Sequence, residues 1–366
     1  MCNLRCSLLF LVLGALIVNC SAQSFAPSER RRDAKSGTKP PSAGHLVPTG
    51  TVVASTEVAN SFDLPITCDN DGNLYLQSEQ FGTSGIRKLN AKGERVALFQ
   101  PNANPEMKII GVGDYAISPS GELYEFVLPE EITRYVMVYK SDGSYKSLIK
   151  LQPGFAWIPS TLAVFASGNL LVSGLEYDKN EKRFVWPFTA IFSSDGTLLK
   201  EVKLEDDDTL RDMAASGDSR VSSSTNPSSN FAIEFGQSQA ASDGNVYLMR
   251  WVTPTIFYAL SPGGGVVRRF LVDPGDENFK PAEMHVAGSR IAVLFYHPQT
   301  GELLMKIVDL EGHEIATYDQ AKVNGKPTTN DALGSAFACY TDDPQRFTFL
   351  TTGDGQKLEL RAAEAR

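Results

Sequence analysis

Short apolar runs alternate along the chain with glycine-containing turns, and the alternation repeats. In the first unit the turn Asp71-Gly72-Asn73 precedes the apolar run Leu74–Leu76, and a second turn follows at Lys92-Gly93. Asp-Gly and Asn-Gly pairs between apolar runs indicate β-hairpins, because glycine supplies the positive φ that tight turns between twisted strands require. Each unit therefore predicts a meander of four antiparallel strands.

The unit recurs six times between about residues 50 and 365. The later first turns lie at Ser120-Gly121, Ser167-Gly168, Asp243-Gly244, Gly288 and Asp342–Gln345. The second strand of each unit is apolar at consecutive positions, which indicates a sheet that neighbouring sheets cover on both faces. Such sheets, repeated at a period of about 40 to 50 residues, are typical of a β-propeller.

The sixth unit supplies only three strands, ending at Lys357–Arg361, whereas Thr51–Thr56 precedes the first unit without a partner. Pairing these two segments would close the ring and cover an edge that is otherwise open to aggregation. The predicted fold class is all-β: a six-bladed β-propeller of four-stranded antiparallel blades, closed by an N-terminal strand that pairs with the last blade.

These units resemble the six-bladed β-propellers of the NHL-repeat and TolB-like type. The resemblance rests on Leu64-Pro65-Ile66 with Asp69–Leu76, and then on Asp243–Leu248. It implies the fold and says little about function. The Asn-x-Arg-Ile element common in NHL repeats is reduced to Gly85-Ile86-Arg87 in the first unit and is absent from the others.

The N-terminus predicts export. Residues 1–22 have the charge, the short apolar run and the small residue Ala22 of a secretory signal peptide. A lipoprotein leader cut before Cys20 is the alternative. Residues 23–48 predict a flexible, basic, Pro-containing linker. The propeller is expected over residues 49–366, with an insertion at about 205–232, and no segment predicts a transmembrane helix.

Composition limits the partners. Of the 366 residues, 42% are hydrophobic, and the formal net charge of −9 argues against nucleic-acid binding. We expect an exported monomer, periplasmic or extracellular, that binds a protein or carbohydrate.

In a propeller of this strand order, the longer connections share one face with the channel mouth, and this face usually carries function. Aromatic residues expected there suit stacking on sugars or anchoring a peptide, although they could instead pack beneath the loops. The candidate ligand-binding residues are Phe81, Asp114, Trp157, Trp186, Trp251, Glu283, His285 and Tyr296.

No strong catalytic motif is present, and no cofactor is expected. Similar enzymatic propellers include lactonases with a channel metal, so a metal-assisted hydrolase or lyase acting through Asp114 and Glu283 is the alternative function. Asp63, Asp114 and Glu283 could hold Ca²⁺, because hard cations need only oxygen ligands. The insertion opens with the acidic run Glu205–Asp208 and is rich in serine, which favours a disordered or mobile flap over a cation-binding strip.

Cleavage after Ala22 would leave only Cys68 and Cys339 in an oxidising compartment. They occupy equivalent places in the first and sixth units, which are neighbours in a closed ring. We expect either a disulfide across the closure or two buried free thiols, because adjacent inner strands can hold Cα atoms too far apart to bridge.

Overall fold

The computed structural model divides the chain into two units, residues 1–38 and 39–366. The residues that it describes are 42–58, 62–78, 85–105, 107–129, 134–180, 182–216, 231–234, 236–320, 322–323, 326–327 and 333–366. The predicted signal peptide, most of the predicted linker, Phe81 and the middle of the insertion lie outside these residues.

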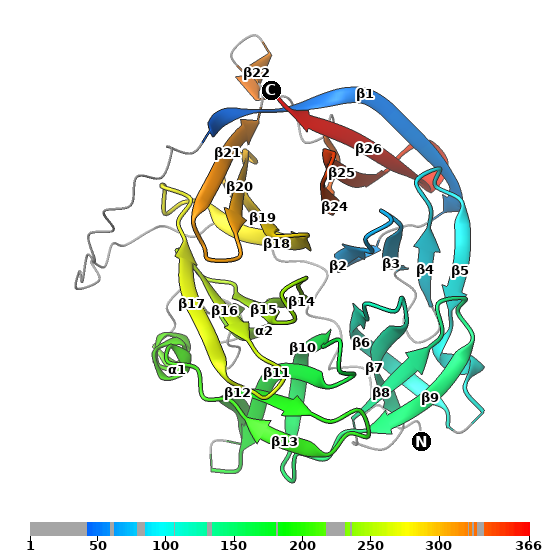
Figure 1. The fold of residues 1–366 in the computed structure, drawn as a ribbon, viewed down its shortest axis with the longest axis vertical. Coiled ribbons are helices and arrows are strands. Elements are labelled where there is room, and N and C mark those ends of the chain that lie inside the picture. The colour runs from blue at the N-terminus through cyan, green and yellow to red at the C-terminus, as the bar shows by residue number, and fades with distance from the viewer. Residues whose placement is uncertain are drawn as a thin grey trace, which may run out of the picture. The chain divides into compact units, whose positions relative to one another are not determined.

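Four sheets each contain four antiparallel strands in chain order. Their strands are β2 (Phe62–Cys68), β3 (Leu74–Ser78), β4 (Ile86–Leu89) and β5 (Arg95–Phe99); β6 (Ile109–Ile117), β7 (Leu123–Pro129), β8 (Tyr135–Tyr139) and β9 (Tyr145–Lys150); β10 (Trp157–Val164), β11 (Leu170–Asp178), β12 (Arg183–Phe192) and β13 (Leu198–Glu201); and β14 (Gln237–Ala240), β15 (Val246–Arg250), β16 (Thr255–Leu260) and β17 (Val266–Val272). The first strand of each sheet is innermost in a propeller-like ring (Figure 1).

The remaining large sheet has eight strands in the order β18-β19-β20-β21-β1-β26-β25-β24. Its bounds are β18 (Lys280–Ala287), β19 (Arg290–Tyr296), β20 (Leu303–Asp309), β21 (Glu314–Gln320), β1 (Ser42–Val58), β26 (Lys357–Ala365), β25 (Gln345–Thr352) and β24 (Ala336–Asp342). A small hairpin, β22 (Lys322–Val323) with β23 (Lys326–Pro327), follows β21. The all-β ring of antiparallel sheets expected from the sequence is therefore present.

Strand β1 joins the two ends of the folded chain. Its residues 52–54 pair antiparallel with residues 361–359 of β26, as the sequence predicts, and Ser42–Leu46 also pair parallel with residues 316–320 of β21. The strand begins at Ser42, inside the segment predicted to be linker. Among residues 43–46, whose burial the structure describes, only Leu46 is fully buried, so a local hydrophobic pattern could not reveal this part of the strand.

Glycines in the turns allow neighbouring sheets to approach each other closely. Gly196, in the β12–β13 turn, has φ +86°, and a Cβ there would lie 2.1 Å from the carbonyl oxygen of Lys150 in β9. Only glycine allows both the left-handed backbone and this close approach.

The core lies between consecutive sheets rather than inside one layer. Residues of β7 and β15 are buried on both faces, as expected for second strands. One apolar cluster joins Ile66 and Leu74 of the first sheet to Leu350 and Leu360 of β25 and β26. The first and last strand sets therefore pack against each other and close the ring.

The insertion differs from the prediction of a disordered or mobile flap where the structure describes it. Its ends form α1 (Asp207–Ala215) and α2 (Phe231–Glu234). Leu210, Ala232 and Ile233 are buried in the cluster between β10–β13 and β14–β17. These apolar side chains anchor both ends of the insertion to the ring.

Candidate functional site

Each meander places its connections on two faces. Turns such as β2–β3 lie on one face, which we call the turn face. The β15–β16 and β19–β20 connections, together with connections between sheets such as β17–β18, lie on the opposite face, which we call the top face. Because the strands of each sheet follow one another in chain order, innermost strands run from the top face to the turn face.

Among the described residues, five innermost strands break register with the neighbouring strand. The breaks lie at Asp63/Thr67, Val112/Tyr115, Pro159/Thr161, Pro281/Glu283 and Phe337/Cys339. Irregularities of this kind redirect side chains and recur beside functional sites.

Polar side chains from innermost strands bind the free backbone edge of the next innermost strand. Asp114 Oδ2 accepts the Leu162 N–H at 2.8 Å, and Gln237 Oε1 accepts the Met284 N–H at 2.7 Å. These contacts satisfy backbone donors that an innermost edge leaves without a strand partner.

One such side chain spans the centre of the ring. Gln239 Oε1 accepts the Val286 N–H at 2.7 Å, and its Nε2 donates to Thr67 Oγ1 of β2 at 3.0 Å. Strands β14 and β2 are not neighbours in the ring (Figure 1). Because Thr67 lies one residue from the end of β2, this bond crosses the channel towards the turn face.

Glu283 and His285 of β18 are buried rather than exposed at the channel mouth, with 3% and 2% of their surfaces exposed. His285 Nε2 lies 2.9 Å from the Phe337 carbonyl oxygen, and burial lowers the pKa of His285 to about 4. Burial also raises the pKa of Glu283 to about 8, against the opposing effect of the Phe337 N–H. Both side chains are therefore mainly uncharged at neutral pH.

Asp114 is the third predicted polar residue. Burial raises the pKa of its carboxyl to about 7, although backbone hydrogen bonds from Leu162 and Tyr115 oppose the shift. Within the described residues, Asp114 Oδ1 and Glu283 Oε2 are buried and have no hydrogen-bond partner. The side chain of Asp63, the other carboxyl proposed for Ca²⁺, lies outside the described part.

Glu125 of β7 was not singled out from the sequence. It is fully buried and accepts a hydrogen bond from the Tyr139 hydroxyl at 2.9 Å. Burial raises the pKa of Glu125 to about 8, against the opposing effect of this hydrogen bond. The available signal was a lone acidic residue in the apolar run Leu123–Val127.

The three tryptophans do not form the single rim that the sequence suggested. Trp157 is 6% exposed and packs near Phe188 and Phe192, with ring centroids 5.6 and 6.2 Å away. Trp186 is 40% exposed, and its indole donates to Asp178 Oδ2 at 2.7 Å. Trp157 therefore contributes to packing between sheets and is removed from the candidate ligand-binding residues.

Trp251 and Tyr296 do come together, at the top-face ends of two sheets. Their ring centroids lie 6.3 Å apart, and Phe279 lies 5.4 Å from His297 in an edge-on contact. The Thr253 hydroxyl donates to the Phe279 carbonyl oxygen at 2.9 Å, which ties the two pairs together. All four rings are partly exposed. We call Trp251, Phe279, Tyr296 and His297 the aromatic cluster.

The acidic run at the start of the insertion makes ion pairs within the protein. Asp206 Oδ2 lies 2.9 Å from Arg269 Nε, and Asp207 Oδ1 lies 3.2 Å from the buried Arg250 Nη2. The cation-binding strip considered from the sequence is therefore replaced by contacts to the chain's own arginines.

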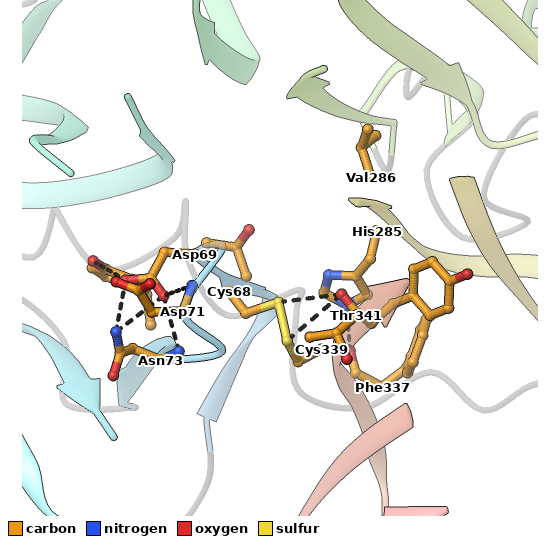
Figure 2. The surroundings of a disulfide bond; sticks show 12 residues. Cys68, Asp69, Asp71, Asn73, His285, Val286, Phe337, Cys339 and Thr341 are labelled. Atoms are coloured by element: carbon orange, nitrogen blue, oxygen red, sulfur yellow. Dashed lines mark hydrogen bonds between the residues drawn. A yellow bond between two sulfur atoms is a disulfide. The ribbon is translucent and has the colours of Figure 1, made fainter. Parts of the chain in front are cut away.

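Cys68 of β2 and Cys339 of β24 are joined by a disulfide, with their Cα atoms 5.4 Å apart. The bond lies beside His285 and Phe337 (Figure 2). It connects the first innermost strand with the last one at the centre of the ring, whereas β1 joins the same two ends of the folded chain at the outer edge.

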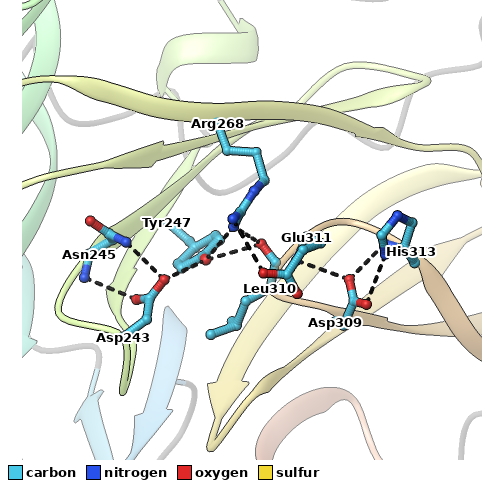
Figure 3. Close-up of polar contacts among 8 residues, drawn as sticks. All are labelled: Asp243, Asn245, Tyr247, Arg268, Asp309, Leu310, Glu311 and His313. Carbon is cyan, nitrogen blue, oxygen red and sulfur yellow. Dashed lines mark hydrogen bonds and ion pairs between the residues drawn. The ribbon is translucent and has the colours of Figure 1, made fainter. Parts of the chain in front are cut away.

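The residues behind the NHL-type resemblance stabilise turns. The Tyr247 hydroxyl lies 2.9 Å from Asp243 Oδ2 and 3.1 Å from the Leu310 carbonyl oxygen (Figure 3). Arg268, 3.2 Å from Glu311, extends the same network between β14–β17 and β20–β21. The motif residues thus hold neighbouring sheets together at the turn face. This structural role explains why the resemblance carries information about the fold and little about function.

The alternative function expected from the sequence needs a metal ion in the channel, held by carboxyls such as Asp114 and Glu283. Among the described residues, no group of three or more His, Cys, Asp or Glu is arranged to hold a metal ion. No helix in the same residues is long and apolar enough to span a membrane.

Comparisons with known proteins give structural likeness only. No family model and no curated protein matches the chain. Similar solved structures include an aldose sugar dehydrogenase with bound PQQ from Streptomyces coelicolor, at 13% identity and TM-score 0.47, covering 90% of this chain and all of that one. A protein described as exported from Bacteroides fragilis has 11% identity and TM-score 0.48, covering 89% and 99%. A protein described as TolB from Agrobacterium tumefaciens has 12% identity and TM-score 0.41, covering 82% and 89%. What this chain binds must therefore be inferred from its own residues.

Proposed function

We propose that the protein is an exported six-bladed β-propeller of the NHL-repeat or TolB-like type, and that it acts as a binding module. Its ligand is a saccharide held on the aromatic cluster of the top face. The observation that carries this proposal is the cluster itself, four partly exposed rings brought together from separate top-face segments.

Contacts between sheets support a count of six blades. A Cβ at Gly143, in the β8–β9 turn, would lie 2.5 Å from the Leu98 carbonyl oxygen of β5. A Cβ at Gly93, in the β4–β5 turn, would lie 3.1 Å from the Ser55 Cα of β1. For the first sheet, β1 therefore takes the place of a preceding outermost strand, which groups it with β24–β26 as a sixth blade beside β18–β21.

The N-terminal sequence and the cysteine pair support export. The signal-peptide pattern of residues 1–22 directs a chain out of the cytoplasm. A disulfide between Cys68 and Cys339 would persist in the oxidising compartment that export reaches.

Ring chemistry favours a saccharide. Aromatic faces bind the apolar C–H faces of sugar rings, and nearby polar groups fix their orientation. The Tyr296 hydroxyl and the imidazole of His297 supply such groups within the cluster itself. Lys280, which pairs with Tyr296 across β18 and β19, adds an ammonium group on the neighbouring strand.

Calorimetric titration of the exported protein with a panel of neutral oligosaccharides tests the proposal. For an oligosaccharide that binds, Trp251→Ala should weaken binding by more than about 1 kcal/mol, because aromatic anchors dominate such contacts. Trp186→Ala is the matched control, because Trp186 is exposed outside the cluster. Absence of any saccharide binding, or equal weakening by both substitutions, would contradict the proposal.

A further inference from the structure

Three hydroxyl residues form a row across the sheet β10–β13. Thr161 lies directly opposite Ser173, and Ser173 lies opposite Thr189, so all three side chains share one face. Apolar residues of the same face, Ala163 and Leu171, share a cluster with residues of β14–β17. The hydroxyl row therefore faces the gap between these two sheets.

The opposite wall of this gap carries Ser238 and Arg250. Ser238 pairs with Leu248, and Arg250 follows two residues later on the same face of β15. Arg250 is fully buried. Its Nη1 donates to Ser173 Oγ at 2.7 Å, and its Nη2 donates to Thr189 Oγ1 at 3.1 Å.

Three polar atoms in the gap lack partners among the described residues. They are Arg250 Nε, Thr161 Oγ1 and Ser238 Oγ, on residues that are 0%, 1% and 9% exposed. Unpartnered buried polar atoms are costly, and an unpartnered guanidinium N–H more so than a neutral group. On the other face of the same sheet the corresponding residues are apolar: Leu162, Val172 and Ala190.

The guanidinium of Arg250 has carboxylates on one side only: Asp207 pairs with Nη2, and Asp206 interacts with it electrostatically, whereas Nε has no hydrogen-bond partner among the described residues. Its carboxylate partner in the gap is Asp207, with Oδ1 at 3.2 Å from Nη2. Burial raises the pKa of Asp207 even though Arg250 opposes the shift, so the carboxylate is itself poorly solvated. An anion beside Nε would reduce the cost of burying this cation.

We infer that the gap between β10–β13 and β14–β17 binds a small oxyanion, a carboxylate or phosphate group, through Arg250 Nε and the Thr161 and Ser238 hydroxyls. All three groups can donate hydrogen bonds to oxygen. Thr161 and Ser238 lie on β10 and β14, the innermost strands of their sheets. This site is separate from the aromatic cluster and does not depend on saccharide binding.

Thermal unfolding in sodium acetate, sodium phosphate and sodium chloride at equal ionic strength tests the inference. Binding to the folded state raises the unfolding midpoint with the logarithm of ligand concentration once the site saturates. A rise in acetate beyond that in chloride identifies a carboxylate, and a rise in phosphate identifies a phosphate group. Identical midpoints in all three salts would overturn the inference and leave water as the occupant.

Variants separate the site from a general salt effect. The double substitution Thr161→Val with Ser238→Ala removes two donors but keeps the Arg250–Asp207 pair, and should weaken anion binding at least about tenfold. Thr255→Val is the matched control, because Thr255 is equally buried with an unpartnered hydroxyl. Thr255 lies on β16 next to Ile256, which faces the gap, so its own side chain points to the opposite side of the sheet.

A charge change at Asp207 provides a second test, in which anion binding should become tighter rather than weaker. Asp207→Asn removes the carboxylate that competes for Arg250, so the anion should bind more tightly than in the wild type. Unchanged or weaker anion binding in Asp207→Asn, or an equal response in the double variant and the wild type, would contradict the proposed site.

Discussion

Individual buried carboxyl groups explain several features of the ring centre. Asp114 and Glu283 lie at register breaks of innermost strands, where their side chains reach the backbone edge of the next strand. Burial raises the pKa values of Asp114, Glu125 and Glu283 to about 7, 8 and 8. Each group is therefore easier to bury as the neutral acid, and the stability of the ring depends on pH.

The first prediction concerns this dependence. The folded-state pKa of Glu283, about 8, lies above its ordinary value of 4.5, so its contribution is complete at low pH and is lost as pH rises towards 8. His285 has a lowered pKa, so it opposes this trend only below its ordinary value of 6.5. The free energy of unfolding should therefore fall from pH 6.5 to 8.5. In the Glu283→Gln variant it should fall less steeply over the same range.

Urea unfolding of both proteins across this pH range measures the difference. Glu201→Gln, at an exposed position in β13, is the control and should retain the wild-type slope. Parallel curves for the wild type and Glu283→Gln would show that Glu283 does not gain a proton on folding.

A second residue-scale prediction distinguishes two tryptophans. Trp157→Ala should lower the free energy of unfolding by about 3–5 kcal/mol, because it empties a buried site between Phe188 and Phe192. Trp186→Ala should cost much less, because the ring is 40% exposed. Denaturant titration measures both, and similar losses would contradict the assignment of Trp157 to packing.

Among the elements, β1 gives the sharpest test of the fold. Leu46 is fully buried in the cluster between β18–β21 and β24–β26, although the sequence placed it in a linker. Leu46→Ala should therefore cost about 2–5 kcal/mol of stability. Val52→Ala, at a half-exposed position of the same strand, is the control. If the Leu46→Ala protein were as stable as this control, Leu46 would not be part of the core.

The sequence predicts turns and second strands well because both depend on local chemistry. Gly72 and Gly244 have positive φ where the repeat placed hairpin turns, and consecutive apolar residues mark strands buried on both faces. The start of β1 could not be predicted, because its partner β21 is distant in sequence and Pro48 interrupts the pattern.

The candidate site was harder to predict because exposure depends on neighbouring sheets. A tryptophan at or beyond the end of a strand has the same local signal whether it packs inward, as Trp157 does, or stays partly exposed, as Trp251 does. Likewise, nothing local places the Asp207 carboxylate against Arg250, which is 43 residues away in the chain. These contacts arise only when the ring brings separate units together.

At the scale of the whole molecule, the disulfide reports on ring closure. In the unreduced protein, neither Cys68 nor Cys339 should react with an alkylating agent after denaturation, and digestion should yield one linked peptide pair. Replacing both cysteines with alanine should cost about 2–5 kcal/mol, since the bond closes a long loop in the unfolded chain. Two alkylated thiols in the unreduced protein would refute the bond.

Tryptophan fluorescence tests the central claim, ligand binding at the aromatic cluster, most directly. The chain has three tryptophans, so Trp157→Phe with Trp186→Phe leaves Trp251 as the sole indole fluorophore. Saturation with an oligosaccharide that binds the wild type should change the Trp251 emission at the concentration that calorimetry gives. A Trp251→Phe protein, which retains Trp157 and Trp186, should show no such change. Saccharide binding that leaves the Trp251 emission unaltered would place the ligand elsewhere and contradict the account.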